Sequence, residues 1–140
     1  MQSYPVLLPM TPEARDAMGK DAVMIDKIPF RFGRECRPVN IVASVMYKER
    51  RKKGLKPNND LYMFDRGNVL NISREHFQIE KKVDGSYEMV DRGSACGTIV
   101  DDKLIGGNDR SGRCSLGDEN IIVVGTRESP FVYKFQLSSG

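Results

Sequence analysis

The sequence predicts an all-β fold, a β-sandwich of about ten or eleven short strands with a short N-terminal lead-in. Three observations support this prediction. Short apolar or alternating segments recur along the chain, turn-forming residues separate them, and long helical periodicity is absent. With 140 residues, of which 39% are hydrophobic and 29% charged, the chain is large enough for one domain with one core.

Residues 1–21 are predicted to form the lead-in, which includes a short helix. Thr11 is a typical N-cap residue, Pro12 suits the first helical position, and Glu13 favours the first turn. Gly19 is typical of the position just beyond a helix C-terminus. We therefore expect about two turns of helix over residues 11–19.

Strand patterns begin at residue 22 and continue almost to the end of the chain. Phe77 and Ile79 alternate with polar residues, so they should lie on one buried face. Asp84-Gly85 stands between two strand patterns and predicts a hairpin turn. The predicted strands span residues 22–28, 30–32, 61–64, 76–82, 87–90, 98–100, 103–105, 113–115, 121–124 and 131–137.

We assign residues 22–137 to the domain and 138–140 to a tail, with an insertion at about 40–59 that interrupts the strand rhythm. Within the insertion, the apolar run 41–47 fits either a strand or a short helix. The segment 48–56 behind it is strongly basic, with six Lys or Arg residues and one Glu. The whole chain carries a net charge of +3 and this segment +5, so the remaining residues carry −2.

The basic segment has three open interpretations: a solvated loop, a contact with acidic or phosphate groups, or non-specific attraction to anionic lipid or nucleic acid. Because the basicity is local, no specific nucleic-acid partner is expected.

The rest of the sequence argues against several further classes of protein. No stretch approaches the roughly 20 apolar residues of a membrane helix, and the N-terminus lacks the pattern of a secretory signal, so we expect a cytoplasmic protein. Cys36, Cys96, Cys114 and the single His76 have no metal-ligand spacing, so no metal is expected. We expect the domain to be monomeric.

Three separated motifs place phosphate-binding chemistry on turns between strands. Gly33-Arg34 ends one strand pattern, Ser73-Arg74-Glu75-His76 begins another, and residues 91–98 read Asp-Arg-Gly-Ser-Ala-Cys-Gly-Thr. A dianionic phosphate favours a guanidinium fork, hydroxyl donors and backbone N–H groups. If these loops lie at one end of a sandwich, their donors converge on one site.

This ordered set of motifs, together with Leu116-Gly117-Asp118 and Gly125, resembles the forkhead-associated (FHA) domain over about residues 22–137. The resemblance implies an FHA/SMAD-like sandwich and a non-catalytic module that binds protein segments carrying phosphothreonine, in signalling or assembly that depends on Ser/Thr kinases. It implies no metal or other cofactor.

The resemblance also implies a role for each matching residue. The residues expected to bind the phosphopeptide fall into a phosphate group and a peptide group. Gly33 and His76 are expected to support the loops. The phosphate group is Arg34, Ser73 and Arg74, and the peptide group is Cys96 with Gly97 and Thr98, of which the last two are expected to shape the turn. Arg50, Arg51, Lys52 and Lys53 form a possible accessory basic set.

Cys96 departs from the family pattern, which has Asn before Gly-Thr to hold the backbone of the ligand. A thiol is a weak donor and a weak acceptor, so it does not replace an amide. Losing two neutral hydrogen bonds of about 0.5–1.5 kcal/mol each would weaken binding about tenfold or more. The alternative function is therefore a phospho-independent interaction or scaffold domain with a degenerate phosphate site. Cys96 and His76 lack an orienting partner motif and an oxyanion-hole signature, so we expect no enzyme.

Overall fold

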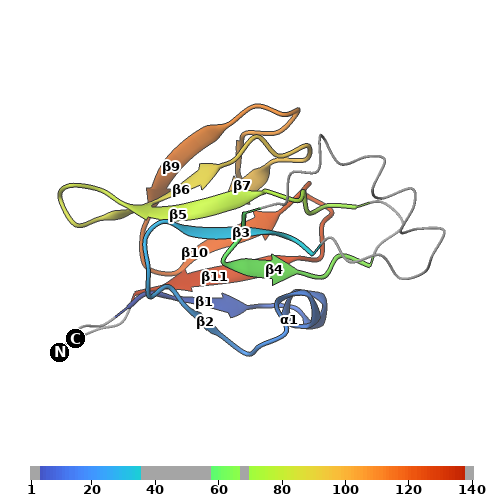
Figure 1. The fold of residues 1–140 in the computed structure, drawn as a ribbon, viewed down its shortest axis with the longest axis horizontal. Helices are drawn as coiled ribbons and strands as arrows, with labels where there is room; N and C mark the ends of the chain where they lie inside the picture. Colours follow the sequence, from blue (N-terminus) through green and yellow to red (C-terminus); the bar gives the residue numbers. More distant parts are fainter. Residues whose placement is uncertain (1–3, 36–57, 67–69, 138–140) are drawn as a thin grey trace.

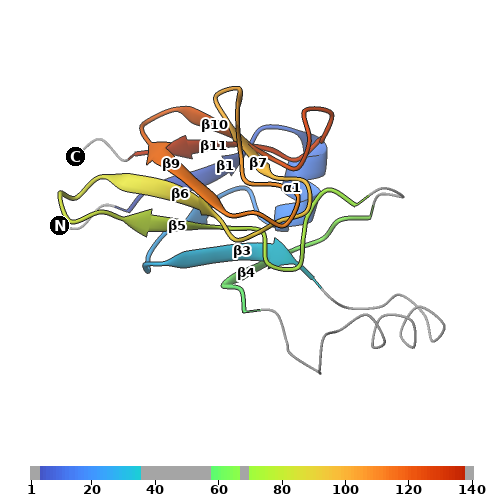
Figure 2. The same cartoon turned by 90° about the horizontal axis from the view of Figure 1, so that it is seen from above.

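The computed structural model describes residues 4–35, 58–66 and 70–137, and within these ranges the chain forms a two-sheet β-sandwich with one short helix. One sheet has the order β2-β1-β11-β10-β7-β8 and the other β4-β3-β5-β6-β9. Figures 1 and 2 show the two sheets as packed layers, as the sequence predicts. The elements are β1 (Val6–Pro9), α1 (Pro12–Met18), β2 (Val23–Met24), β3 (Phe30–Arg34), β4 (Leu61–Met63), β5 (Phe77–Lys81), β6 (Tyr87–Asp91), β7 (Thr98–Val100), β8 (Lys103–Ile105), β9 (Gly112–Leu116), β10 (Asn120–Val124) and β11 (Val132–Gln136).

Most strands lie where the sequence predicts them. β7 and β8 have the predicted bounds, and the other predicted strands agree within two residues, except the first. The prediction for residues 22–28 was wrong, because only Val23–Met24 pair with a neighbouring strand. The hairpin at Asp84-Gly85 is confirmed, with the Lys82 N–H donating to Ser86 O at 2.7 Å. The run 41–47 lies outside the described residues.

The helix and its caps are confirmed. The Thr11 side chain accepts a hydrogen bond from the Ala14 N–H at 3.0 Å, and Pro12 occupies the first turn. Gly19 has φ 73°, a left-handed conformation that glycine adopts without strain, and its N–H donates to Arg15 O at 2.8 Å. The start and the end of this helix are therefore encoded locally.

The described residues before residue 22 pack on the sandwich. The sequence did not predict β1. This strand pairs with β11, which lies near the other end of the sequence. Leu7, Ala14 and Ala17 are completely buried. The Tyr133 hydroxyl donates to Ala14 O at 2.9 Å in the interior, which ties α1 to β11.

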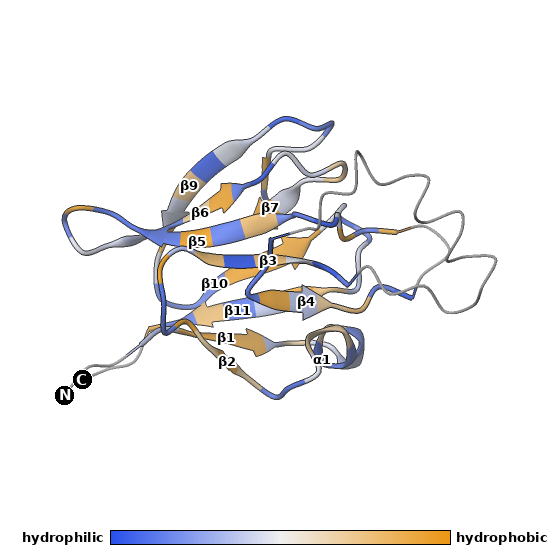
Figure 3. Ribbon diagram, in the orientation of Figure 1, coloured by the Kyte–Doolittle hydropathy of each residue, from blue (hydrophilic) through white to orange (hydrophobic). Residues whose placement is uncertain are grey.

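Aromatic rings from neighbouring strands fill the interior between the sheets. The rings of Phe32 and Phe77 stack with centroids 4.5 Å apart. Phe77 and Ile79 are both fully buried, as their alternation predicts, and Figure 3 shows apolar and polar residues alternating along β5. Burial of apolar surface of this kind is the main stabilising contribution in a small domain.

This core holds several strand ends together at one end of the molecule, on the right in Figure 1. The last residues of β3 and β6 and the residues just before β5 and β7 meet there, joined by hydrogen bonds between their loops. No helix in the described part of the chain is long and apolar enough to cross a membrane.

Candidate functional site

The site begins at the end of β3, where Gly33 allows two backbone segments to touch. A Cβ atom at this position would lie 2.0 Å from the Arg74 carbonyl oxygen and 2.6 Å from the Asn59 side chain. Any larger residue would therefore push the Ser73-Arg74 turn away from β3. This close approach is the physical reason for glycine before Arg34.

Arg34 fixes the loop that precedes β5. Its N–H donates to Ser73 O at 2.9 Å, and its Nε donates to Ile72 O at 2.8 Å. One residue therefore holds two successive carbonyl groups. The Nε bond fixes the plane of the guanidinium group, which has five N–H donors in all.

Ser73 lies between this loop and the one that precedes β7. Its N–H donates to His76 Nδ1 at 2.9 Å, and its Oγ accepts the Ala95 N–H at 3.0 Å. Among the described residues, the Ser73 hydroxyl proton has no acceptor. The accepted bond fixes the position of Oγ and leaves its O–H as a donor for a ligand oxygen.

His76 is fully buried and links the same two loops. Because Nδ1 accepts the Ser73 N–H, the ring proton lies on Nε2, which donates to Gly97 O at 2.7 Å. Burial lowers the pKa of His76, although the Gly97 carbonyl and the Asp91 carboxylate oppose this effect. The neutral ring therefore connects the turn at Ser73 to the turn at Gly97.

The buried histidine predicts a loss of stability in mild acid. Below about pH 6.5 the unfolded chain binds a proton on its histidine, while the folded chain, with a lowered pKa, does not. The free energy of unfolding should fall by at most about 1.4 kcal/mol per pH unit until the pH reaches the lowered pKa. Urea unfolding from pH 7 to 5 tests this, because the chain has a single histidine. Constant stability over that range would contradict a neutral, buried ring.

Asp91, at the end of β6, organises the turn that follows it. Its Oδ1 accepts the N–H groups of Gly93 and Ser94 at 3.0 and 2.8 Å. Its Oδ2 accepts the hydroxyls of Ser94 and Thr98 at 2.7 and 2.8 Å. Ser94 Oγ in turn accepts the Gly97 N–H at 2.9 Å. The turn is therefore built around one buried carboxylate.

The three predicted peptide-binding residues occupy different environments. Thr98 is fully buried and donates to Asp91, so its side chain supports the turn. Its assignment to the phosphopeptide-binding residues stays a prediction. Gly97 is also buried, with φ 85°. Cys96 is half-buried, and its Sγ lies 3.7 Å from Leu70 O, so its thiol is at the surface between the two loops.

Arg74 is half-buried and follows Ser73, and its guanidinium has no ion pair or hydrogen-bond partner in the part of the chain that the structure describes.

The structure brings Arg34, Ser73, Arg74 and Cys96 to one end of the sandwich, with Gly33 and His76 beneath them. The accessory residues Arg50, Arg51, Lys52 and Lys53 lie outside the described residues and remain a prediction.

Sequence reasoning missed three supporting groups. Asp65 Oδ2 accepts the N–H groups of Asn71 and Ile72 at 2.6 and 3.0 Å, which shapes the loop before Ser73. Asn59 and Arg92 contact the other side of that loop. No spacing rule would have found Asn59 and Arg92, because the partners in these two hydrogen bonds are 15 and 33 residues apart in sequence.

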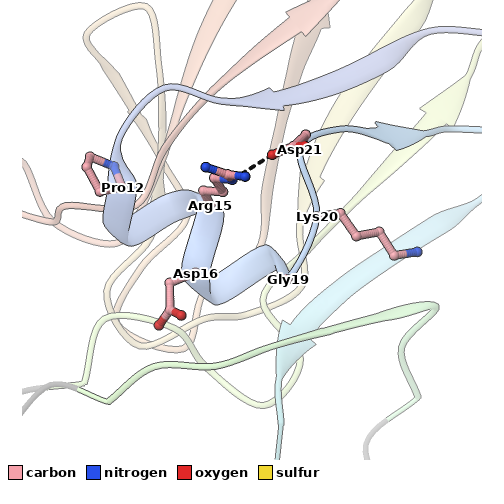
Figure 4. A pocket seen from close by; sticks show the side chains of 6 residues that line it. All are labelled: Pro12, Arg15, Asp16, Gly19, Lys20 and Asp21. Atoms are coloured by element: carbon pink, nitrogen blue, oxygen red, sulfur yellow. Dashed lines mark ion pairs between the residues drawn. The ribbon is translucent and has the colours of Figure 1, made fainter.

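A separate hollow of about 470 Å³ lies beside α1 and contains none of the predicted site residues. Figure 4 shows its charged lining, including an exposed ion pair between Arg15 and Asp21 at 2.6 Å. Exposed pairs of this kind contribute little to stability or recognition. Within the described ranges, no group of three or more His, Cys, Asp or Glu side chains is placed to hold a metal ion.

The fold and these turns define a class of small two-sheet modules with a polar site at one end. The model of the FHA domain family matches residues 30–125, so the chain belongs to the FHA domain family. This confirms the resemblance seen in the motifs. None of the curated proteins matches the chain by sequence.

Solved structures of FHA domains share the fold. The chain is similar to Mycobacterium tuberculosis EmbR in complex with a low-affinity phosphopeptide (TM-score 0.59, 18% identity, all of this chain and 26% of that one). It is also similar to the kinase-interacting FHA domain of the kinase-associated protein phosphatase KAPP in Arabidopsis (0.59, 21%, 99% and 96%). A third is an engineered FHA domain with the Myc-pTBD peptide (0.58, 16%, 99% and 94%). The chain therefore spans about a quarter of EmbR and nearly all of the other two.

Proposed function

We propose that this chain is a non-catalytic module that binds protein segments phosphorylated on threonine, in signalling or assembly that depends on Ser/Thr kinases. The observation that carries the proposal is the Ser73 hydroxyl. Its oxygen is held by the Ala95 N–H, and its proton has no acceptor among the described residues. Arg34 donates to the carbonyls of Ile72 and Ser73 in the same turn, and Arg74 follows Ser73 directly in the sequence. A fixed O–H donor on a turn that contacts one arginine and carries another is suited to a dianionic phosphate.

The donors on this turn suit an anionic ligand with several oxygens. Charge-assisted hydrogen bonds are about twice as strong as neutral ones, and guanidinium groups pair with phosphate oxygens through two N–H groups. EmbR and the engineered FHA domain were solved with peptides, and the EmbR peptide is a phosphopeptide. Both proteins share the fold of this chain, which supports a ligand of the same kind here.

Cys96 limits the contribution of the peptide backbone to binding. Its thiol lies beside Leu70 O at the edge of the site, where the family has an amide. We therefore expect most of the affinity to come from the phosphate group and less from the flanking residues. Binding should be phosphate-dependent but modest in strength.

The experiment is fluorescence anisotropy with three degenerate peptide pools, matched except for phosphothreonine, phosphoserine or unmodified threonine at the centre. We expect binding to the phosphothreonine pool, weaker binding to the phosphoserine pool, and none to the unmodified pool. Equal binding of phosphorylated and unmodified pools would favour the phospho-independent scaffold instead.

The same titration at two salt concentrations addresses the basic set Arg50, Arg51, Lys52 and Lys53. We propose that this set attracts acidic residues near the phosphothreonine, because Glu35 and Asn58, which flank the surrounding segment, both contact the site end of the sandwich. Replacing all four residues with Gln should reduce the salt dependence of binding but retain its dependence on phosphate.

A further inference from the structure

A side-chain amide links two polar groups behind the Ser73-Arg74 turn. Asn59 lies just before β4, and its Nδ2 donates to Arg74 O at 2.7 Å. Its Oδ1 accepts a hydrogen bond from Arg92 Nη1 at 2.6 Å. The amide therefore connects the residue after β6 to the backbone of the turn that carries the proposed phosphate donors.

The chemistry of the two partners is matched by an amide at this position. A guanidinium can only donate hydrogen bonds, and a carbonyl oxygen can only accept them. The bridging side chain must therefore accept on one side and donate on the other. Asn meets both needs in one planar group, whereas a carboxylate accepts only and an apolar side chain does neither.

Arg92 is itself held in place from several directions. Only 11% of its side chain is exposed, and its Nη2 donates to Asn58 O at 2.8 Å and lies 3.6 Å from Glu75 Oε2. The same Glu75 oxygen accepts the Asn58 N–H at 3.0 Å. These contacts occupy the guanidinium inside the protein, so Arg92 acts as a brace, not as a further ligand for phosphate.

The carbonyl groups of three successive residues, Ile72, Ser73 and Arg74, each accept a hydrogen bond from another segment. Arg34 holds the carbonyls of Ile72 and Ser73, and Asn59 holds that of Arg74. The first two donors come from β3, while the third depends on Arg92, the residue after β6. Without it, the turn would be fixed at its start but not at the residue that bears the second guanidinium.

We propose that Asn59 and Arg92 form a positioning pair that fixes the Ser73-Arg74 turn in the geometry that binds phosphate. The part of this inference that concerns phosphate rests on the proposed function. The pair does not touch the ligand. It acts by holding the Arg74 backbone, and through it the Ser73 hydroxyl that Ala95 contacts on the other side.

The test compares two variants with a neighbouring control. Asn59→Asp retains an acceptor for Arg92 but cannot donate to Arg74 O, and Arg92→Lys replaces the fork with a point charge. Asn58→Ala is the control, because Asn58 contributes its backbone N–H and carbonyl, which alanine keeps. We expect Asn59→Asp and Arg92→Lys to weaken binding to the phosphothreonine pool about three- to tenfold, and Asn58→Ala to leave it unchanged.

Amide hydrogen exchange without ligand provides a second readout. In Asn59→Asp, exchange at the Arg34 and Ala95 amides, which donate to Ser73, should be faster than in Asn58→Ala, while the amides of β5 and β6 should be unchanged. Uniform acceleration would mean a purely structural role and would overturn the proposal, as would unchanged peptide affinity.

The two readouts separate this inference from the proposed function. If the wild-type chain binds none of the pools, the proposed function fails, and exchange alone then decides whether the pair positions the turn. Local acceleration would support the positioning role, and no acceleration would overturn it.

Discussion

Replacing Arg34 with alanine is expected to reduce phosphothreonine-dependent binding by at least about 100-fold, or about 3 kcal/mol. Arg34 is the last residue of β3, and the Nε bond of its side chain to Ile72 O fixes the guanidinium plane. Charge-assisted hydrogen bonds contribute about 1.5–3 kcal/mol each, and a guanidinium can form two with one phosphate. Anisotropy with the phosphothreonine pool measures the loss.

The matched control is Lys81→Ala, which also removes one positive charge. Lys81 is at the far end of β5, where it pairs with Tyr87 near the hairpin. This variant should bind within about twofold of the wild type, because its charge is screened at that distance. Thermal unfolding should confirm that the Arg34 variant is folded. A folded Arg34→Ala protein that binds as tightly as the Lys81 control would refute the role of Arg34.

Replacing Asp91 with alanine is expected to have the largest effect on stability, a loss of about 3–5 kcal/mol. The fully buried carboxylate accepts four hydrogen bonds, from Gly93, Thr98 and both donors of Ser94. Alanine would leave these buried donors without their acceptor and would leave a cavity. Equilibrium urea unfolding measures the change directly.

Asp16→Ala provides a control on α1, where the aspartate is exposed. It should change stability by no more than about 0.5 kcal/mol. Asp91→Asn should give an intermediate loss, because it keeps one acceptor oxygen, and it serves as the measurable variant if Asp91→Ala does not fold. A loss below about 1 kcal/mol for Asp91→Ala would contradict the central role of this carboxylate.

Locally encoded features could be predicted from the sequence, and features that depend on distant partners could not. The helix α1 follows from Thr11, Pro12 and Gly19, which act within one or two turns. β1 was missed because its partner β11 is more than a hundred residues away, and a four-residue apolar segment ending in Pro9 has no strand signal of its own.

In the candidate site too, local motifs could be predicted and contacts between distant segments could not. The motifs around Arg34, Ser73 and His76 could be located because their order resembles a family pattern. The buried position of Thr98 depends on its contact with Asp91 across the turn, which the motif alone does not reveal. The bridge from Arg92 through Asn59 to Arg74 joins three separate segments, so only the folded chain brings it together.

The most direct test of phosphate recognition at this turn is an NMR titration of the 15N-labelled chain with N-acetyl-phosphothreonine amide. N-acetyl-threonine amide is the control. Saturable shifts at the amides of Arg34, Ser73, Arg74 and Ala95 with the phosphorylated compound alone are the predicted result. A folded protein whose amides at this turn do not respond, or respond equally to both compounds, would contradict phosphate binding here.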